Sequence, residues 1–148
     1  MNLNRQIPPP ICPLSDIHVT YPESQRLKNG IPLHVIRAGM EDVVRFDLLI
    51  GAGQWHQTQA LQAMFTNRML REGTSSLTSQ QIAEKLDYYG AMMELSSSVN
   101  CGFITLYSLN KYFPQTIELV ADMLMNPTFP EKEMEVVVEV NKQRFLIN

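Results

Sequence analysis

The sequence has few of the features that mark several large classes of protein. Its 148 residues include two cysteines, Cys12 and Cys101, which are too few and too far apart for a disulfide framework or a zinc ribbon. No run of 18 apolar residues is present, so we expect no membrane-spanning helix. The first residues also lack the apolar stretch of a secretory signal, which favours a cytoplasmic location.

The chain has no surplus of positive charge. It contains 12 Lys and Arg against 15 Asp and Glu, for a formal net charge of −3. Proteins that bind nucleic acid gain much of their affinity by neutralising phosphates, so we expect no nucleic-acid partner. A hydrophobic content of 45% and a charged content of 18% are typical of a globular protein, and the length fits about one domain.

Common catalytic motifs are missing as well. The 7 glycines form neither of the phosphate-binding loops, and no GxSxG elbow nominates a nucleophilic serine. None of the histidines, which are His18, His34 and His56, has a second His or Cys at the spacing that places two ligands on one helix face. Residue chemistry alone therefore indicates no catalytic centre.

What is present is a pattern of strands. Four prolines among the first 16 residues predict an extended lead-in over residues 1–23. Asn29-Gly30 between two extended runs predicts a β-hairpin with a type I′ turn, and residues 42–50 predict a third strand. Residues 91–98 and 101–109 predict two further strands.

Helical spacing of apolar residues predicts four helices. The first covers residues 58–73 and closes on Gly73, and the second begins at Thr78 with the capping box Thr78-Ser79-Gln80-Gln81. The third covers residues 113–124, and the fourth runs from Pro130 to the end of the chain.

The order of these elements is three strands, two helices, two strands and two helices. It predicts an α+β fold in which the helices pack on one face of an antiparallel or mixed sheet. The fourth helix has no stop signal, so we expect residues 24–148 to be the N-terminal part of a truncated domain whose C-terminal remainder is missing.

Six motifs follow one another along residues 24–145. They are Asn29-Gly30-Ile31, Gly51-Ala52-Gly53, the run from Met69 to Thr74, the run from Ile82 to Gly90, the run from Leu124 to Phe129 and the run from Glu133 to Glu139. As an ordered set they resemble the insulinase/pitrilysin zinc peptidases, and most closely the bacterial branch similar to processing peptidases. The resemblance implies the metallopeptidase-like fold of that family.

The resemblance also implies where a zinc site would lie. Active relatives carry His-x-x-Glu-His on the helix that ends in Met-Leu-x-x-Gly-Thr, and a later Val-rich helix supplies a third ligand, a Glu. Here Met64 and Arg68 stand at the two histidine positions and Asn67 stands at that of the general base. The third position falls on Val140, or on Glu139 if the helix is shifted by one.

These residues are unsuited to zinc chemistry. A thioether is a poor ligand for Zn²⁺, Arg stays protonated, and an amide accepts no proton from water. We therefore expect no zinc and no other cofactor, and a degenerate site at Met64, Asn67, Arg68 and Val140. Met64 and Val140 are predicted to form an apolar contact.

Two arrangements of Arg68 remain open. Its guanidinium could pair with Glu135 or Glu139 on the facing helix, since a buried Arg needs such a partner. Alternatively, the side chain could extend to solvent.

Active relatives bind peptide as an added strand at a sheet edge, which corresponds here to about residues 91–98. Main-chain pairing needs no particular side chain, so peptide binding could persist without catalysis, with Glu94, Leu95, Ser96 and Ser97 as candidate contacts. The expected function is that of a pseudoenzyme: a non-catalytic subunit or domain that pairs with an active insulinase-family peptidase subunit, or with a homologous second domain, and helps to hold peptide. The family's activity would be that of a zinc metalloendopeptidase. Two alternatives stay open: a fragment of a zinc protease whose catalytic site lies outside these residues, and a purely structural or interaction protein.

Overall fold

The computed structural model describes residues 8, 11 and 18–147. The chain divides into two compact units, Met1–Glu41 and Asp42–Asn148, which are treated separately. Most of the predicted lead-in, including Cys12, lies outside the described residues, so that prediction and the domain boundary drawn at residue 24 stay predictions.

The first unit contains the predicted hairpin. Strand β1 (Glu23–Arg26) pairs antiparallel with β2 (Pro32–Val35). The prediction of a type I′ turn is wrong, because that turn needs two residues with positive φ and only Gly30, at +85°, has one. The Asn29 side chain instead accepts a hydrogen bond from the Ile31 N–H at 3.2 Å, which stabilises a wider loop.

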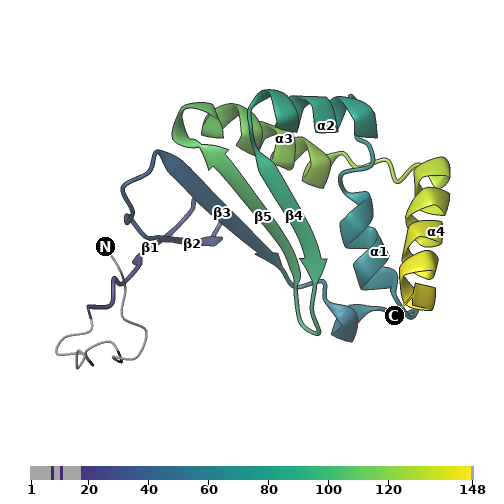
Figure 1. Ribbon diagram of the computed structural model, residues 1–148, viewed down its shortest axis with the longest axis horizontal. Coiled ribbons are helices and arrows are strands. Elements are labelled where there is room, and N and C mark those ends of the chain that lie inside the picture. The colour runs from purple at the N-terminus through teal and green to yellow at the C-terminus, as the bar shows by residue number, and fades with distance from the viewer. Residues whose placement is uncertain (1–7, 9–10, 12–17, 148) are drawn as a thin grey trace. The chain divides into compact units, whose positions relative to one another are not determined.

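The second unit is built on a three-stranded antiparallel sheet. Its strands are β3 (Val43–Ile50), β4 (Met92–Ser97) and β5 (Gly102–Leu109), arranged in the order β3-β5-β4. Figure 1 shows these three strands side by side. The strands expected at residues 42–50, 91–98 and 101–109 are confirmed, with ends that differ by a residue or two.

Four helices accompany this sheet: three of them contact it, and the last packs against the first. They are α1 (Gln62–Met69), α2 (Ser79–Tyr88), α3 (Phe113–Met125) and α4 (Glu131–Ile147), with two 3₁₀ turns, η1 (Gln54–His56) and η2 (Asn110–Tyr112). The predicted capping box is present, since the Thr78 hydroxyl oxygen accepts from the Gln81 N–H while the Gln81 side chain accepts from the Thr78 N–H. Within the described residues, no helix is both long and apolar enough to cross a membrane.

The core lies on one face of the sheet. Alternate residues of β5, Ile104 and Leu106, are almost fully buried against Ile82 of α2 and against α3. The residues between the core positions of β3, such as Arg45 and Leu49, are exposed on the other face. This confirms the predicted α+β fold with helices on one face, and burial of such aliphatic side chains is worth about 1.5–3 kcal/mol each.

The first predicted helix differs from the structure at both ends. Helix α1 begins at Gln62, after Leu61 in a left-handed conformation with φ +69°, and it ends at Met69 rather than at Gly73. Gly73 forms a bridge with Thr78, and an added Cβ there would meet the Thr128 hydroxyl at 3.0 Å. The chain leaves the helix early because this tertiary pairing requires an extended segment.

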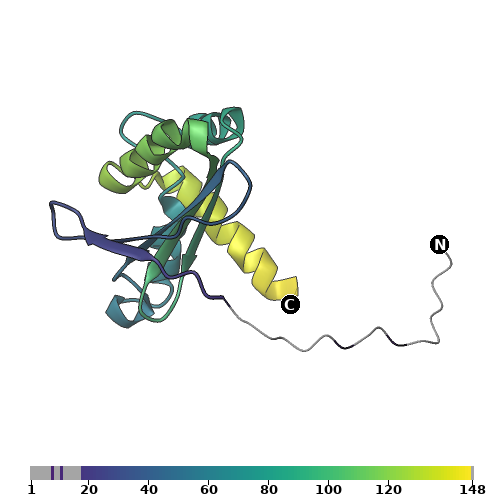
Figure 2. The same cartoon turned by 90° about the vertical axis from the view of Figure 1, so that its left-hand side faces the viewer.

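Helix α1 occupies a central place in the second unit. It contacts β4 on one side and α4 on the other (Figures 1 and 2). None of the described residues of α4 is fully buried, and Val136, Val138 and Val140 are each about half exposed. The position of α1 therefore decides how β4 and α4 face one another.

Candidate functional site

Strand β4 lies at an edge of the described sheet, because its partner within the described residues is β5 alone. The Ser98 N–H donates to the Cys101 carbonyl at 2.8 Å, so Ser98 occupies a hydrogen-bonded position of the β4–β5 ladder beside the turn. Such pairs alternate along an antiparallel ladder. It follows that the backbone N–H and C=O groups of Met93, Leu95 and Ser97 point away from β5, toward the open edge.

Two cavities lie along this edge. The first, here called the Met64 cavity, has a volume of about 400 Å³ and lies between η1, the start of α1 and the end of β4. The second, here called the Val140 cavity, has a volume of about 500 Å³ and lies between α1, the middle of β4 and α4. Arg68 and Leu95 line both cavities, so the two cavities adjoin one another along β4.

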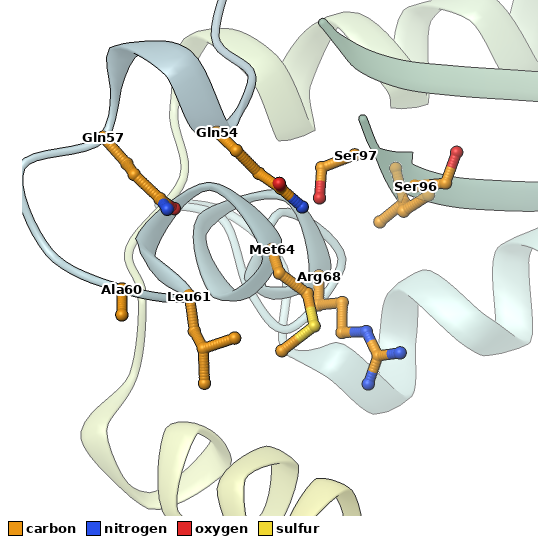
Figure 3. A pocket seen from close by; sticks show the side chains of 9 residues that line it. Gln54, Gln57, Ala60, Leu61, Met64, Arg68, Ser96 and Ser97 are labelled. Atoms are coloured by element: carbon orange, nitrogen blue, oxygen red, sulfur yellow. The ribbon is translucent and has the colours of Figure 1, made fainter. Parts of the chain in front are cut away.

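The residues at the predicted metal positions are divided between these cavities. Met64 lines the first and Val140 lines the second, while Arg68 borders both. Figure 3 shows the Met64 and Arg68 side chains side by side on α1. The predicted apolar contact between Met64 and Val140 stays a prediction.

Arg68 is half-buried and connects α1 to α4. Its Nη1 donates to the Asn141 Oδ1, and Asn141 in turn donates from Nδ2 to the Val137 carbonyl at 2.6 Å. This second bond orients the amide so that its oxygen faces Arg68. The partner of the guanidinium is therefore a neutral amide.

The hypothesis that Arg68 pairs with Glu135 or Glu139 is wrong. In the part of the chain that the structure describes, every ion pair within 4.0 Å joins other residues, and Glu139 pairs with Lys142 at 3.8 Å. The reason is helical geometry, since the face of α4 that borders Arg68 carries Glu133, Val137, Asn141 and Arg144 at the spacing of one helix face. Glu135 and Glu139 point elsewhere and are exposed.

Asn67 is buried and connects α1 to β4. Its Nδ2 donates to the Ser96 carbonyl at 2.6 Å, whereas its buried Oδ1 has no hydrogen-bond partner among the described residues. An amide in this place is unable to take a proton from water. The hydrogen bond from Asn67 to Ser96 therefore holds α1 against the edge strand β4.

Metal-binding side chains do not gather in the described part of the chain. Residues 8, 11 and 18–147 contain no group of three or more His, Cys, Asp and Glu placed to hold an ion. Among the described residues, the shifted pKa values belong to side chains outside the two cavities. On the exposed face of β3, burial raises the pKa of Asp47, but hydrogen bonds from Thr105 and Arg45 outweigh it and leave that pKa below its usual value.

The candidate edge residues lie where they were predicted, on β4. Leu95, Ser96 and Ser97 line the Met64 cavity, and Glu94 lines the Val140 cavity. Whether they bind peptide stays a prediction.

Sequence reasoning missed Asn141, Gln54 and Gln57. Gln54 and Gln57 follow Gly51-Ala52-Gly53, and this motif was the signal available in the sequence. For Asn141 no signal was available, because the apolar residues of α4 do not single out one face.

Comparison with known proteins identifies the family of this chain. The model of the family described as Insulinase (Peptidase family M16) matches residues 35–145. The chain belongs to this family. It is 27% identical over 110 residues to a protein of Bacillus subtilis (strain 168) named "Uncharacterized zinc protease YmxG", an alignment that covers 73% of this chain and 27% of the relative.

Two crystal structures have the same fold. One, described as a peptidase M16 inactive domain from Pseudomonas fluorescens, has a TM-score of 0.72 and 22% identity, and covers 82% of this chain and 30% of that chain. The other, described as a protease from Helicobacter pylori, has a TM-score of 0.72 and 18% identity, and covers 84% of this chain and 31% of that chain. The insulinase-family chain described here thus spans less than a third of the length of these proteins.

Proposed function

We propose that this chain is a non-catalytic M16 subunit or domain that helps to hold peptide for an active peptidase. The observation that carries the proposal is the set of side chains on α1. By the resemblance, Met64, Asn67 and Arg68 take the positions of the family's zinc ligands and base, and none of the three residue types supplies that chemistry. The hydrogen bonds of Asn67 to β4 and of Arg68 to α4 support this proposal, because they give the two polar residues structural roles.

The proposed place for peptide is the open edge of β4. The outward N–H and C=O groups of Met93, Leu95 and Ser97 can pair with an added strand, and main-chain hydrogen bonds supply affinity in such complexes. The two cavities beside this strand provide space for side chains of the peptide. Both features support peptide binding that does not depend on a metal.

The proposed partner is an active M16 subunit or a homologous second domain. The chain spans less than a third of its relatives, so the rest of such an assembly lies outside these residues. The partner would supply the zinc and the general base. In this arrangement the β4 edge would present peptide to a catalytic centre on the other subunit.

Peptide binding is tested by fluorescence anisotropy of a labelled, unstructured peptide titrated with the chain. Replacement of Ser97 by Pro removes an outward N–H while leaving the ladder to β5 intact, so we expect at least a fivefold loss of affinity. Ser97→Ala is the matched control, because it loses the hydroxyl and keeps the N–H. Equal binding by wild type and Ser97→Pro would reject the β4 edge as the site.

The non-catalytic state is tested separately, by metal analysis and by peptide cleavage after zinc addition. We expect far less than one zinc per chain and no cleavage. Stoichiometric zinc together with cleavage by the isolated chain would reject the proposal. If the chain bound neither peptide nor an active M16 peptidase, a purely structural role would be supported instead.

A further inference from the structure

The Met64 cavity contains one charged residue, Arg68, and its other lining residues are neutral. We propose that this cavity binds the carboxylate of an Asp or Glu side chain in the peptide that pairs with β4. This inference rests on the proposed function, and it adds a preference for acidic peptides that depends on Arg68.

The guanidinium of Arg68 has no ion-pair partner within the described residues. Its hydrogen bond goes to the neutral Asn141 through Nη1, and no carboxylate lies within 4.0 Å of the guanidinium. Nε and Nη2 therefore keep N–H groups without partners in this part of the chain. A planar guanidinium binds a carboxylate through two parallel hydrogen bonds, so an incoming acid fits the donors that remain.

The register of β4 brings a peptide side chain to this place. Leu95 presents its backbone outward and turns its side chain toward the core, on the face of the sheet that α1 covers. A residue directly opposite Leu95 on an added strand points to the same face, because paired residues share a face of a sheet. Leu95 and Arg68 line both cavities, so that side chain lies where the two cavities adjoin, beside the guanidinium.

The remaining walls suit the same ligand. The side chains of Gln54, Gln57 and Ser97 line the same cavity as Met64 and Arg68, and Figure 3 shows the amide of Gln54 directed toward the hydroxyl of Ser97. These groups can donate hydrogen bonds to a carboxylate, while Met64 and Leu61 contact the methylene groups of the acid. Leu61 has φ +69°, a conformation that costs a residue with a Cβ about 1–2 kcal/mol and that is often found at binding sites.

The Val140 cavity lacks this selectivity. Three arginines and three glutamates line it, so its charges are of both signs; they are Arg68, Arg71, Arg144, Glu72, Glu94 and Glu133. Arg71 is already paired with Glu72 at 3.2 Å. A preference for acids is thus expected in the Met64 cavity alone.

The test uses a series of otherwise neutral peptides in which a single Glu, or a single Gln, is moved along the sequence. Binding to the full chain is measured by anisotropy at low salt. For the peptide whose variable residue lies opposite Leu95, we expect the Glu form to bind about tenfold more tightly than the Gln form. Arg68→Gln is expected to remove this ratio while leaving the affinity for the Gln form within about twofold of wild type.

Two further variants make the test specific. Arg68→Lys keeps the charge but not the planar fork, so an intermediate ratio is expected, and this variant also serves if Arg68→Gln does not fold. Lys142→Gln removes the same amount of charge from α4 outside the cavity and is expected to keep the full ratio. Equal binding of Glu and Gln forms at every position would overturn the inference while leaving the proposed function intact. Failure of both forms to bind would overturn the proposed function and the inference with it.

Discussion

Gly53 approaches the turn between β4 and β5 so closely that its substitution tests how the edge strand is connected to α1. A Cβ added at Gly53 would lie 2.4 Å from the Asn100 carbonyl carbon, 2.4 Å from the Cys101 nitrogen and 2.6 Å from the Val99 carbonyl oxygen. All three are backbone atoms, so no flexible side chain can move aside. The Gly53→Ala substitution must therefore separate two segments of backbone.

The size of the effect follows from what that separation disrupts. Ordinary contact begins at 3.4 Å, so two atoms that lie at 2.4 Å must move apart by about 1 Å. The same segments are joined by hydrogen bonds from Gly53 N–H to Asn100 O at 3.3 Å, from the next residue, Gln54, to Ser98 O at 3.0 Å and from Trp55 N–H to Val99 O at 2.8 Å. Overpacking costs about 1–3 kcal/mol and each weakened bond adds up to about 1 kcal/mol. We expect a loss of about 3 kcal/mol in the free energy of unfolding.

Urea and thermal unfolding of the whole chain measure this loss. A change of about 3 kcal/mol corresponds to a fall in Tm of about 6–12 °C in a protein of this size. Gly51→Ala is the matched control, because an added Cβ there meets nothing within 4 Å, and we expect it to change stability by less than about 0.5 kcal/mol. If Gly53→Ala were as stable as Gly51→Ala, the close approach between the η1 segment and the β4–β5 turn would be refuted.

Two further substitutions test other parts of the second unit. Thr78→Ala removes the capping box of α2 and is expected to lower stability by about 1 kcal/mol, seen as a fall in Tm of about 2–4 °C; an unchanged Tm would contradict the cap. The hydrogen bonds of Asp47 with Thr105 and Arg45 lower the pKa of its carboxyl group in the folded state. Their contribution to the free energy of unfolding is therefore fully present above the pKa of Asp in the unfolded chain, about 4. This contribution is lost as the pH falls through the lower pKa of the folded state. The difference in urea midpoint between wild type and Asp47→Asn should therefore narrow between about pH 4 and pH 2, and a difference that stays constant with pH would contradict this linkage.

The strands and the start of α2 could be predicted from sequence because each depends on neighbouring residues. Residues 42–50 are rich in Val, Phe, Leu and Ile, which favours a strand, and the structure confirms it in β3. The capping box at Thr78 is a hydrogen-bond pattern within four residues, so it too can be recognised locally. The resemblance to the insulinase family, which is shown for residues 35–145, rested on several such local motifs in order.

The features that sequence reasoning missed depend on contacts between distant elements. The end of α1 is decided by bridges from Gly73 to Thr78 and from Thr74 to Pro127, which no local pattern encodes. The partner of Arg68 depends on which face of α4 meets α1. Because apolar and polar residues are mixed around α4, the Glu residues were equally plausible partners, and the contact with Asn141 appears only in three dimensions.

The same contacts explain how the proposed edge site could persist without a metal. A catalytic zinc binds a scaffold that is already folded, so its loss removes chemistry and leaves the packing of the elements. In this chain, the Asn67 amide joins α1 to β4 and the Arg68 guanidinium joins α1 to α4. If the proposal is right, residues at former metal positions now fix the distance between the edge strand and its facing helix. Because main-chain pairing needs no particular side chain, the substitution Arg68→Gln should alter which peptides bind far more than whether the edge of β4 can pair with a strand.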